Sequence, residues 1–173
     1  MNKNLKKGFT LIEAIVYLAL FSLLMGGAVI TSYDLFESSG RGGAHATLQE
    51  EGNFLLAKIS WALSGAQAVT TPAAPASACS APSSTLTVSK WDSSVGSVSI
   101  QQSGTNATLG RLLTGVTLLL NSPGVQISNL SFIHCWGGGS NPDSIETSFT
   151  LSTRNTNGMP LSQDFSSTEY VRR

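Results

Sequence analysis

One carboxylate stands inside a long apolar run near the start of the chain. Glu13 is the single charged residue between Phe9 and Ile30. A charged side chain costs roughly 2.5–3.5 kcal/mol at the centre of a membrane-spanning helix, and less near the interface. We therefore expect Glu13 to have a partner of opposite charge. The alternative is a tolerated interfacial residue whose side chain reaches the lipid headgroups.

Two cysteines, Cys79 and Cys135, form the second set of residues with their own chemistry. In an exported protein such a pair usually forms a disulfide, here closing a loop of about 57 residues, worth around 4 kcal/mol at most. Free thiols are one alternative, and a metal site with His134 and His45 is another. A metal needs three or four well-spaced ligands, so we expect no metal site.

Other candidate sites are incomplete. The sequence contains no nucleophile elbow, phosphate-binding loop or zinc signature. The triple glycine at 137–139 precedes no helix, so it is not a phosphate cradle. Asp143 and Glu146 are too few for the six to eight oxygens around calcium. We expect neither an enzyme nor a bound cofactor.

The apolar run predicts the helix that must position Glu13. Residues 9–30 would form a helix of about 33 Å, enough to cross a bilayer core of about 30 Å. Three lysines precede the run, while Asp34 and Glu37 follow it, which places the N-terminus in the cytoplasm. A cleaved secretory signal is the competing interpretation, with the nearest small-residue site at Gly26-Gly27-Ala28.

The segment Lys6-Lys7-Gly8-Phe9-Thr10-Leu11-Ile12-Glu13 resembles the processing site of type IV prepilins and of the pseudopilins of type II secretion. The resemblance implies that a prepilin peptidase cleaves between Gly8 and Phe9 and methylates the new amine of Phe9. It makes Glu13 the fifth mature residue, an acceptor for the amine of a neighbouring subunit. The implied partners are the peptidase, other pilin or pseudopilin subunits, and the inner (cytoplasmic) membrane, crossed once before assembly into an extracytoplasmic, cell-surface filament.

The tail adds a weaker resemblance to minor pilins and minor pseudopilins. It rests on three segments, residues 129–132, 163–167 and 171–173, which look like the closing strands of those subunits. A minor subunit is therefore favoured over a major one.

The resemblance and the residue patterns together predict an α+β, pilin-like fold in four parts. These are a cleaved leader at 1–8, a membrane or filament-core helix at 9–30, an amphipathic continuation at 31–66, and a linker with a β-rich head at 67–173. One apolar face supports the continuation; it comprises Leu48, Leu55, Ile59, Ala62 and Ala66. The glycines within residues 38–43 predict a bend or melted turn, because glycine disfavours helix.

Residues 67–84 read as a Pro/Ala/Ser linker without an element of its own. Alternating patterns then predict an antiparallel meander packed on the helix. The expected strands are 85–90, 95–101, 109–113, 125–135, 145–154 and 165–171, with 116–120 either a strand or a helical turn.

The net charge argues against one further class of function, nucleic-acid binding. Loss of the three leader lysines leaves seven basic against ten acidic side chains, which argues against nucleic-acid binding. The predicted function is a structural subunit of a pilus-like filament or secretion pseudopilus. The alternatives are a membrane-anchored extracytoplasmic binding domain that never polymerises, and a secreted enzyme behind a signal peptide.

Overall fold

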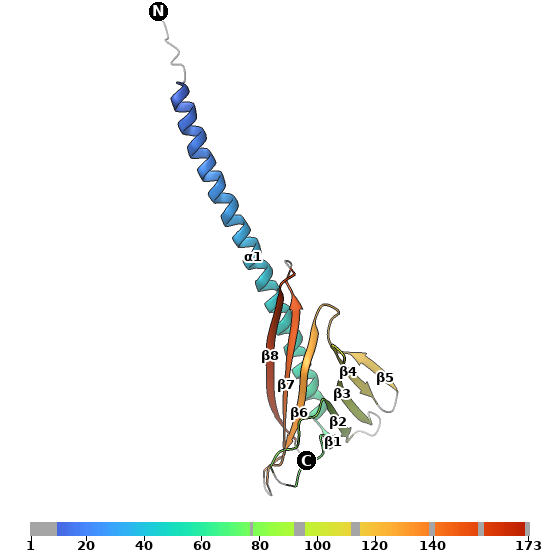
Figure 1. The fold of residues 1–173 in the computed structure, drawn as a ribbon. Helices are drawn as coiled ribbons and strands as arrows, with labels where there is room; N and C mark the ends of the chain where they lie inside the picture. The colour runs from blue at the N-terminus through green and yellow to red at the C-terminus, as the bar shows by residue number, and fades with distance from the viewer. Residues whose placement is uncertain are drawn as a thin grey trace, which may run out of the picture. The chain divides into compact units, whose positions relative to one another are not determined.

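A computed structural model describes residues 10–76, 78–91, 96–111, 115–138, 141–155 and 158–171. It consists of one long helix followed by two antiparallel sheets, which confirms the predicted α+β class (Figure 1). The chain divides after Arg41 into two compact units. The predicted leader lies outside the described residues.

Helix α1 runs from Leu11 to Leu63, a length of 53 residues. The predicted melted turn at residues 38–43 is wrong, because the backbone stays helical through all of them. Each glycine costs up to about 1 kcal/mol in a helix interior, but the hydrogen-bonded turns on both sides hold this segment helical. Glu37 and Arg41 add a contact of 2.5 Å between carboxylate and guanidinium at i,i+4 spacing.

The first sheet has five strands in sequential order. They are β1 (Ala66–Thr71), β2 (Thr85–Lys90), β3 (Ser97–Ser103), β4 (Asn106–Arg111) and β5 (Val116–Leu119). Strands β2 and β3 pair as the predicted hairpin. The region around 116–120, ambiguous in the sequence, is a strand paired with β4.

The second sheet has three strands, β6 (Gln126–Cys135), β7 (Ser144–Arg154) and β8 (Pro160–Tyr170). The prediction of one meander is therefore wrong in one respect, since the strands divide into two sheets. A register shift lies between Ser128 and Ser131 of β6, where Asn129 has a positive φ of 55°. The bulge turns Leu130 toward Gln102 of β3, whose Oε1 accepts the Leu130 backbone N–H at 3.0 Å.

The proposed linker contains more structure than the sequence pattern predicted. Residues 66–71 form β1, which pairs antiparallel with β2, so the helix ends at Leu63 and not near 66. Farther along, Ser83 and Phe132 exchange backbone hydrogen bonds of 2.9 and 2.8 Å. Residues 78–83 thus lie along the outer edge of β6, where isolated bridges join Cys79 to Cys135 and Ser83 to Phe132. Local composition could not reveal this pairing, because the partner strand lies about fifty residues away.

The core of the unit that begins at Gly42 lies between the C-terminal part of α1 and the two sheets (Figure 1). All five residues of the predicted face are buried, but only those from Leu48 to Ala62 belong to the helix, because Ala66 begins β1. They pack in one cluster with buried residues from both sheets. The largest fully buried side chains are Phe132, Phe149, Leu48, Leu55, Ile59, Leu86, Ile100, Ile127, Ile145 and Leu151.

Candidate functional site

The start of α1 positions the candidate carboxylate. Thr10 precedes the helix, and its side-chain Oγ1 accepts the backbone N–H of Glu13 at 3.4 Å. Its carbonyl accepts the N–H of Ala14 at 3.2 Å, which is the first helical hydrogen bond. Thr10 and Glu13 therefore have the spacing of a capping box, Thr-x-x-Glu, which stabilises helix N-termini.

The capping position gives Glu13 a structural role that sequence reasoning did not consider. A carboxylate in the first turn also interacts favourably with the positive end of the helix dipole. The signal was present in the sequence as Thr10-x-x-Glu13, immediately before an apolar run. Any test of Glu13 must therefore separate capping from charge.

Glu13 has no cationic partner among the residues that the structure describes. The close acid–base contacts found there join Glu37 to Arg41 and Asp143 to His134. Gly8 and Phe9, the predicted cleavage and methylation residues, lie outside the described residues.

The first half of α1 presents apolar side chains that nothing in its own unit covers. It contains one segment long and apolar enough to cross a membrane, and none of that segment is buried. Its hydroxyls are satisfied locally: Ser22 donates to the Leu18 carbonyl at 2.8 Å, and Ser32 to the Ala28 carbonyl at 2.8 Å. Such internal bonding suits a helix in lipid, where water cannot satisfy polar groups.

Cys79 and Cys135 form a disulfide, with sulfurs 2.02 Å apart and a sequence separation of 56 residues. The bond fastens the segment after β1 to the end of β6. The alternatives to this bond are free thiols and a metal site; free thiols are contradicted, because both cysteines are bonded. Among the described residues, no three His, Cys, Asp or Glu side chains gather to hold a metal ion.

A buried His–Asp pair lies next to this disulfide and was not foreseen. His134 Nδ1 is 3.1 Å from the Pro72 carbonyl, and its Nε2 is 3.4 Å from Oδ2 of Asp143. The second distance is within ion-pair range but lacks hydrogen-bond geometry. The other oxygen of Asp143 accepts the Gly137 N–H at 3.1 Å. The pair ties three separate segments together, and both side chains are buried.

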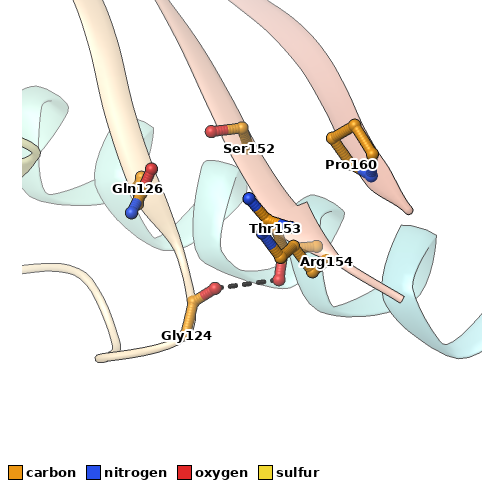
Figure 2. Close-up of a pocket in the computed structure, with 6 residues that line it drawn as sticks. All are labelled: Gly124, Gln126, Ser152, Thr153, Arg154 and Pro160. Atoms are coloured by element: carbon orange, nitrogen blue, oxygen red, sulfur yellow. Dashed lines mark hydrogen bonds between the residues drawn. The ribbon is translucent and has the colours of Figure 1, made fainter. Parts of the chain in front are cut away.

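A surface hollow of about 430 Å³ lies where β6, β7 and β8 come together near residues 124 and 160 (Figure 2). Thr153 donates its hydroxyl to the Gly124 carbonyl at 2.8 Å, and Arg154 donates to the Gly158 carbonyl at 3.3 Å. The residues that line it are Gly124, Gln126, Ser152, Thr153, Arg154 and Pro160. The described lining offers the hydroxyls of Ser152 and Thr153 and the guanidinium of Arg154, but no carboxylate, imidazole or thiol that could act as a base beside them.

Comparison with known proteins supports the N-terminal resemblance. A family model described as the prokaryotic N-terminal methylation motif matches residues 3–29. The match spans most of the predicted leader, the predicted cleavage position, Glu13 and most of the apolar run. No curated protein and no solved structure matches the chain.

Proposed function

We propose that this chain, a member of the type IV prepilin and pseudopilin family by its N-terminal motif, is a minor structural subunit of a type IV pilus-like filament or type II secretion pseudopilus. The observation that carries the proposal is the first half of α1. Its residues 11–30 are apolar and uncovered, and a single carboxylate, Glu13 in the first turn, interrupts them. The motif marks a pilin-like precursor that is processed by prepilin peptidase.

The proposed sequence of events begins in the inner membrane. Residues 1–8 form a cytoplasmic leader that the peptidase removes between Gly8 and Phe9, and Phe9 is then N-methylated. The helix from residue 9 to residue 30 is stored in the bilayer as a single pass and later packs in the filament core. Residues 31–63 continue that helix, and the sheets from residue 66 onward form the extracytoplasmic head.

Glu13 would guide the subunit from bilayer to filament. A neighbouring subunit, displaced along the filament, would bring its Phe9 amine to the Glu13 carboxylate. An opposite charge within about 4–6 Å favours the ionised carboxylate, and exclusion of water strengthens the attraction. Loss of one partner would leave a buried charge unpaired, at a cost of about 3–5 kcal/mol.

The test separates charge from capping. Gln can take the place of Glu in a capping box, so Glu13→Gln should keep the helix start while removing the charge. We expect this variant to be processed and retained in the membrane, with incorporation into filaments reduced at least tenfold. Glu37→Gln is the matched control, because Glu37 is partly exposed on the same helix and pairs within its own chain. Normal incorporation of Glu13→Gln would refute the role of the charge.

The rival function is an anchored binding domain that does not polymerise. It predicts that Gly8→Val changes neither the mass nor the fate of the chain. The mature N-terminus distinguishes the two directly, by mass spectrometry of the purified full chain. N-methyl-Phe9 supports the proposed subunit, whereas an unprocessed Met1 or a start near residue 29 would overturn it.

A further inference from the structure

Strand β5 leaves an apolar edge open on the five-stranded sheet. It is the last strand in the order β1-β2-β3-β4-β5, and all four of its residues are exposed. Val116, Leu118 and Leu119 have exposed fractions of 50%, 54% and 67%. The strand carries neither a charge nor a proline, the features that usually protect an edge from pairing.

The pairing pattern shows which backbone groups face outward. The Leu120 N–H donates to the Ala107 carbonyl at 2.9 Å, and the register continues Leu118 with Leu109 and Val116 with Arg111. These even-numbered residues are therefore the hydrogen-bonded pairs. The N–H and C=O groups of Thr117 and Leu119 point away from β4, where they are free to pair with another strand.

The other sheet edges are treated differently. Strand β1 has two register shifts, which disrupt an edge for pairing. The outer edge of β6 is covered by residues 78–83. Strand β8 alternates in exposure and carries Asp164 and Glu169. Among the described strands, β5 is thus the edge with neither cover, bulge nor charge.

An acidic groove adjoins β5, formed by Glu50, Glu51, Phe54 and residues 119–122, with a volume of about 440 Å³. Glu51 accepts the Ser122 hydroxyl, which fixes its carboxylate at the groove wall. Glu50 is exposed, and no described ion pair involves it. Phe54 supplies an aromatic surface with an exposed fraction of 44%. The Lys58 ammonium of the same chain already lies over one face of this ring, 5.2 Å from its centroid, so an incoming cation would meet the Glu50 carboxylate and not that face. The groove therefore suits a side chain with an apolar stem and a positive head.

We propose that β5 and the acidic groove bind an extended apolar segment, flanked by Lys or Arg, from a different subunit of the same filament. The segment adds a sixth strand through the free backbone groups of Thr117 and Leu119, and its cation lies against Glu50. Backbone pairing supplies affinity in such strand addition, and side-chain contacts supply selectivity. The proposal rests on the proposed function, which supplies the neighbouring subunit.

The charges argue against a second copy of this chain as the occupant. In a second copy, the long and regular edge strand that could pair with β5 is β8. Its Asp164 and Glu169 would meet the carboxylates of the groove. Like charges placed together at an interface cost several kcal/mol. A non-identical subunit with basic residues avoids that repulsion.

The test uses the full chain in cells that assemble the filament. A photo-cross-linking phenylalanine replaces Leu118, whose side chain is exposed, and the cross-linked peptide is identified by mass spectrometry. The same residue at Ser166 of β8 is the control position. Thr117→Pro removes an outward N–H without removing a bond to β4, whereas Thr117→Val keeps it. Glu50→Lys reverses the charge of the groove, and Glu146→Lys is its control on an exposed position of β7.

We expect the Leu118 position to capture an apolar peptide with adjacent Lys or Arg from another chain that carries the same N-terminal motif. Thr117→Pro should lower the yield at least tenfold and Glu50→Lys at least threefold, while Thr117→Val and Glu146→Lys leave it unchanged. Capture of a second copy, no capture at Leu118, or an undiminished yield in both variants would overturn the proposal. N-methyl-Phe9 is measured in the same sample, so failure of the proposed function is recognised separately.

Discussion

Gly52 lies on the buried face of α1 at the point where Phe165 of β8 packs against the helix. A Cβ added at Gly52 would overlap three atoms of the Phe165 ring, far inside the normal contact distance of about 3.5–4.0 Å. The ring cannot simply retreat, because it stacks on buried Phe149 with a centroid distance of 5.3 Å. We therefore predict that Gly52→Ala destabilises the head, although alanine favours helix.

Two opposing free-energy terms set the size of the destabilisation by Gly52→Ala. Alanine gains about 1 kcal/mol over glycine in a helix interior. Overpacking of a core costs about 1–3 kcal/mol, and here the upper part applies because the ring is held on its other side. The expected net loss is about 1–2 kcal/mol, which lowers Tm by roughly 3–8 °C for a domain of this size.

The assay is differential scanning calorimetry of the full chain in mild detergent. Gly43→Ala is the matched control, since Gly43 is on the same helix and has nothing within 4 Å of an added Cβ. It should raise Tm slightly. A double-mutant cycle with Phe165→Leu should show a coupling of at least about 1 kcal/mol, because the smaller side chain relieves the overlap. If Gly52→Ala raises Tm as much as Gly43→Ala does, the proposed close packing is refuted.

Three further predictions concern the head, each measured as the free energy of unfolding in urea. Lys90 donates its ammonium to carbonyls at the end of α1, so Lys90→Met should cost about 1–2 kcal/mol at neutral pH. Burial lowers the pKa of Lys90 from its ordinary 10.5, so the unfolded chain holds that proton more tightly than the folded protein does. As the pH rises toward 10.5, the free energy of unfolding of the wild type should therefore rise relative to that of Lys90→Met. Asn121 is buried; its side chain accepts the Ala107 N–H at 2.9 Å and donates to the Val125 carbonyl at 2.5 Å. Asn121→Ala should cost about 2–3 kcal/mol. Asn121→Leu, which restores the volume but not these bonds, should lose a similar amount, and a clearly smaller loss would point to packing instead. Cys79→Ser should lower stability by up to about 4 kcal/mol under oxidising conditions, with no further loss on adding reductant.

Much of the architecture followed from local patterns. The helical face from Leu48 to Ala62 was readable because α-helical periodicity aligns those positions on one side. Strand β2 matches its predicted bounds, since alternation and turn residues delimit it. The shift of phase in β6 was visible in the sequence as Ile127 followed by Leu130, and the structure explains it as a bulge.

Other features depended on partners distant in sequence. Residues 66–71 and 78–83 gain their extended structure from β2 and β6, so their composition alone suggested a spacer. The continuous helix through residues 38–43 shows that glycine propensity is a weak signal inside a helix already formed on both sides. His134 and Asp143 meet only because β6, its following loop and Pro72 converge.

The sequence by itself determined the processing motif, the apolar span and the charge at Glu13. Each of these features lies in one continuous stretch of sequence. None of them depends on the fold of the head. Tertiary structure decided which surfaces of the head remain open. An exposed edge such as β5 exists only relative to the strands that do or do not pair with it, and only folding placed Glu50 and Phe54 beside that edge.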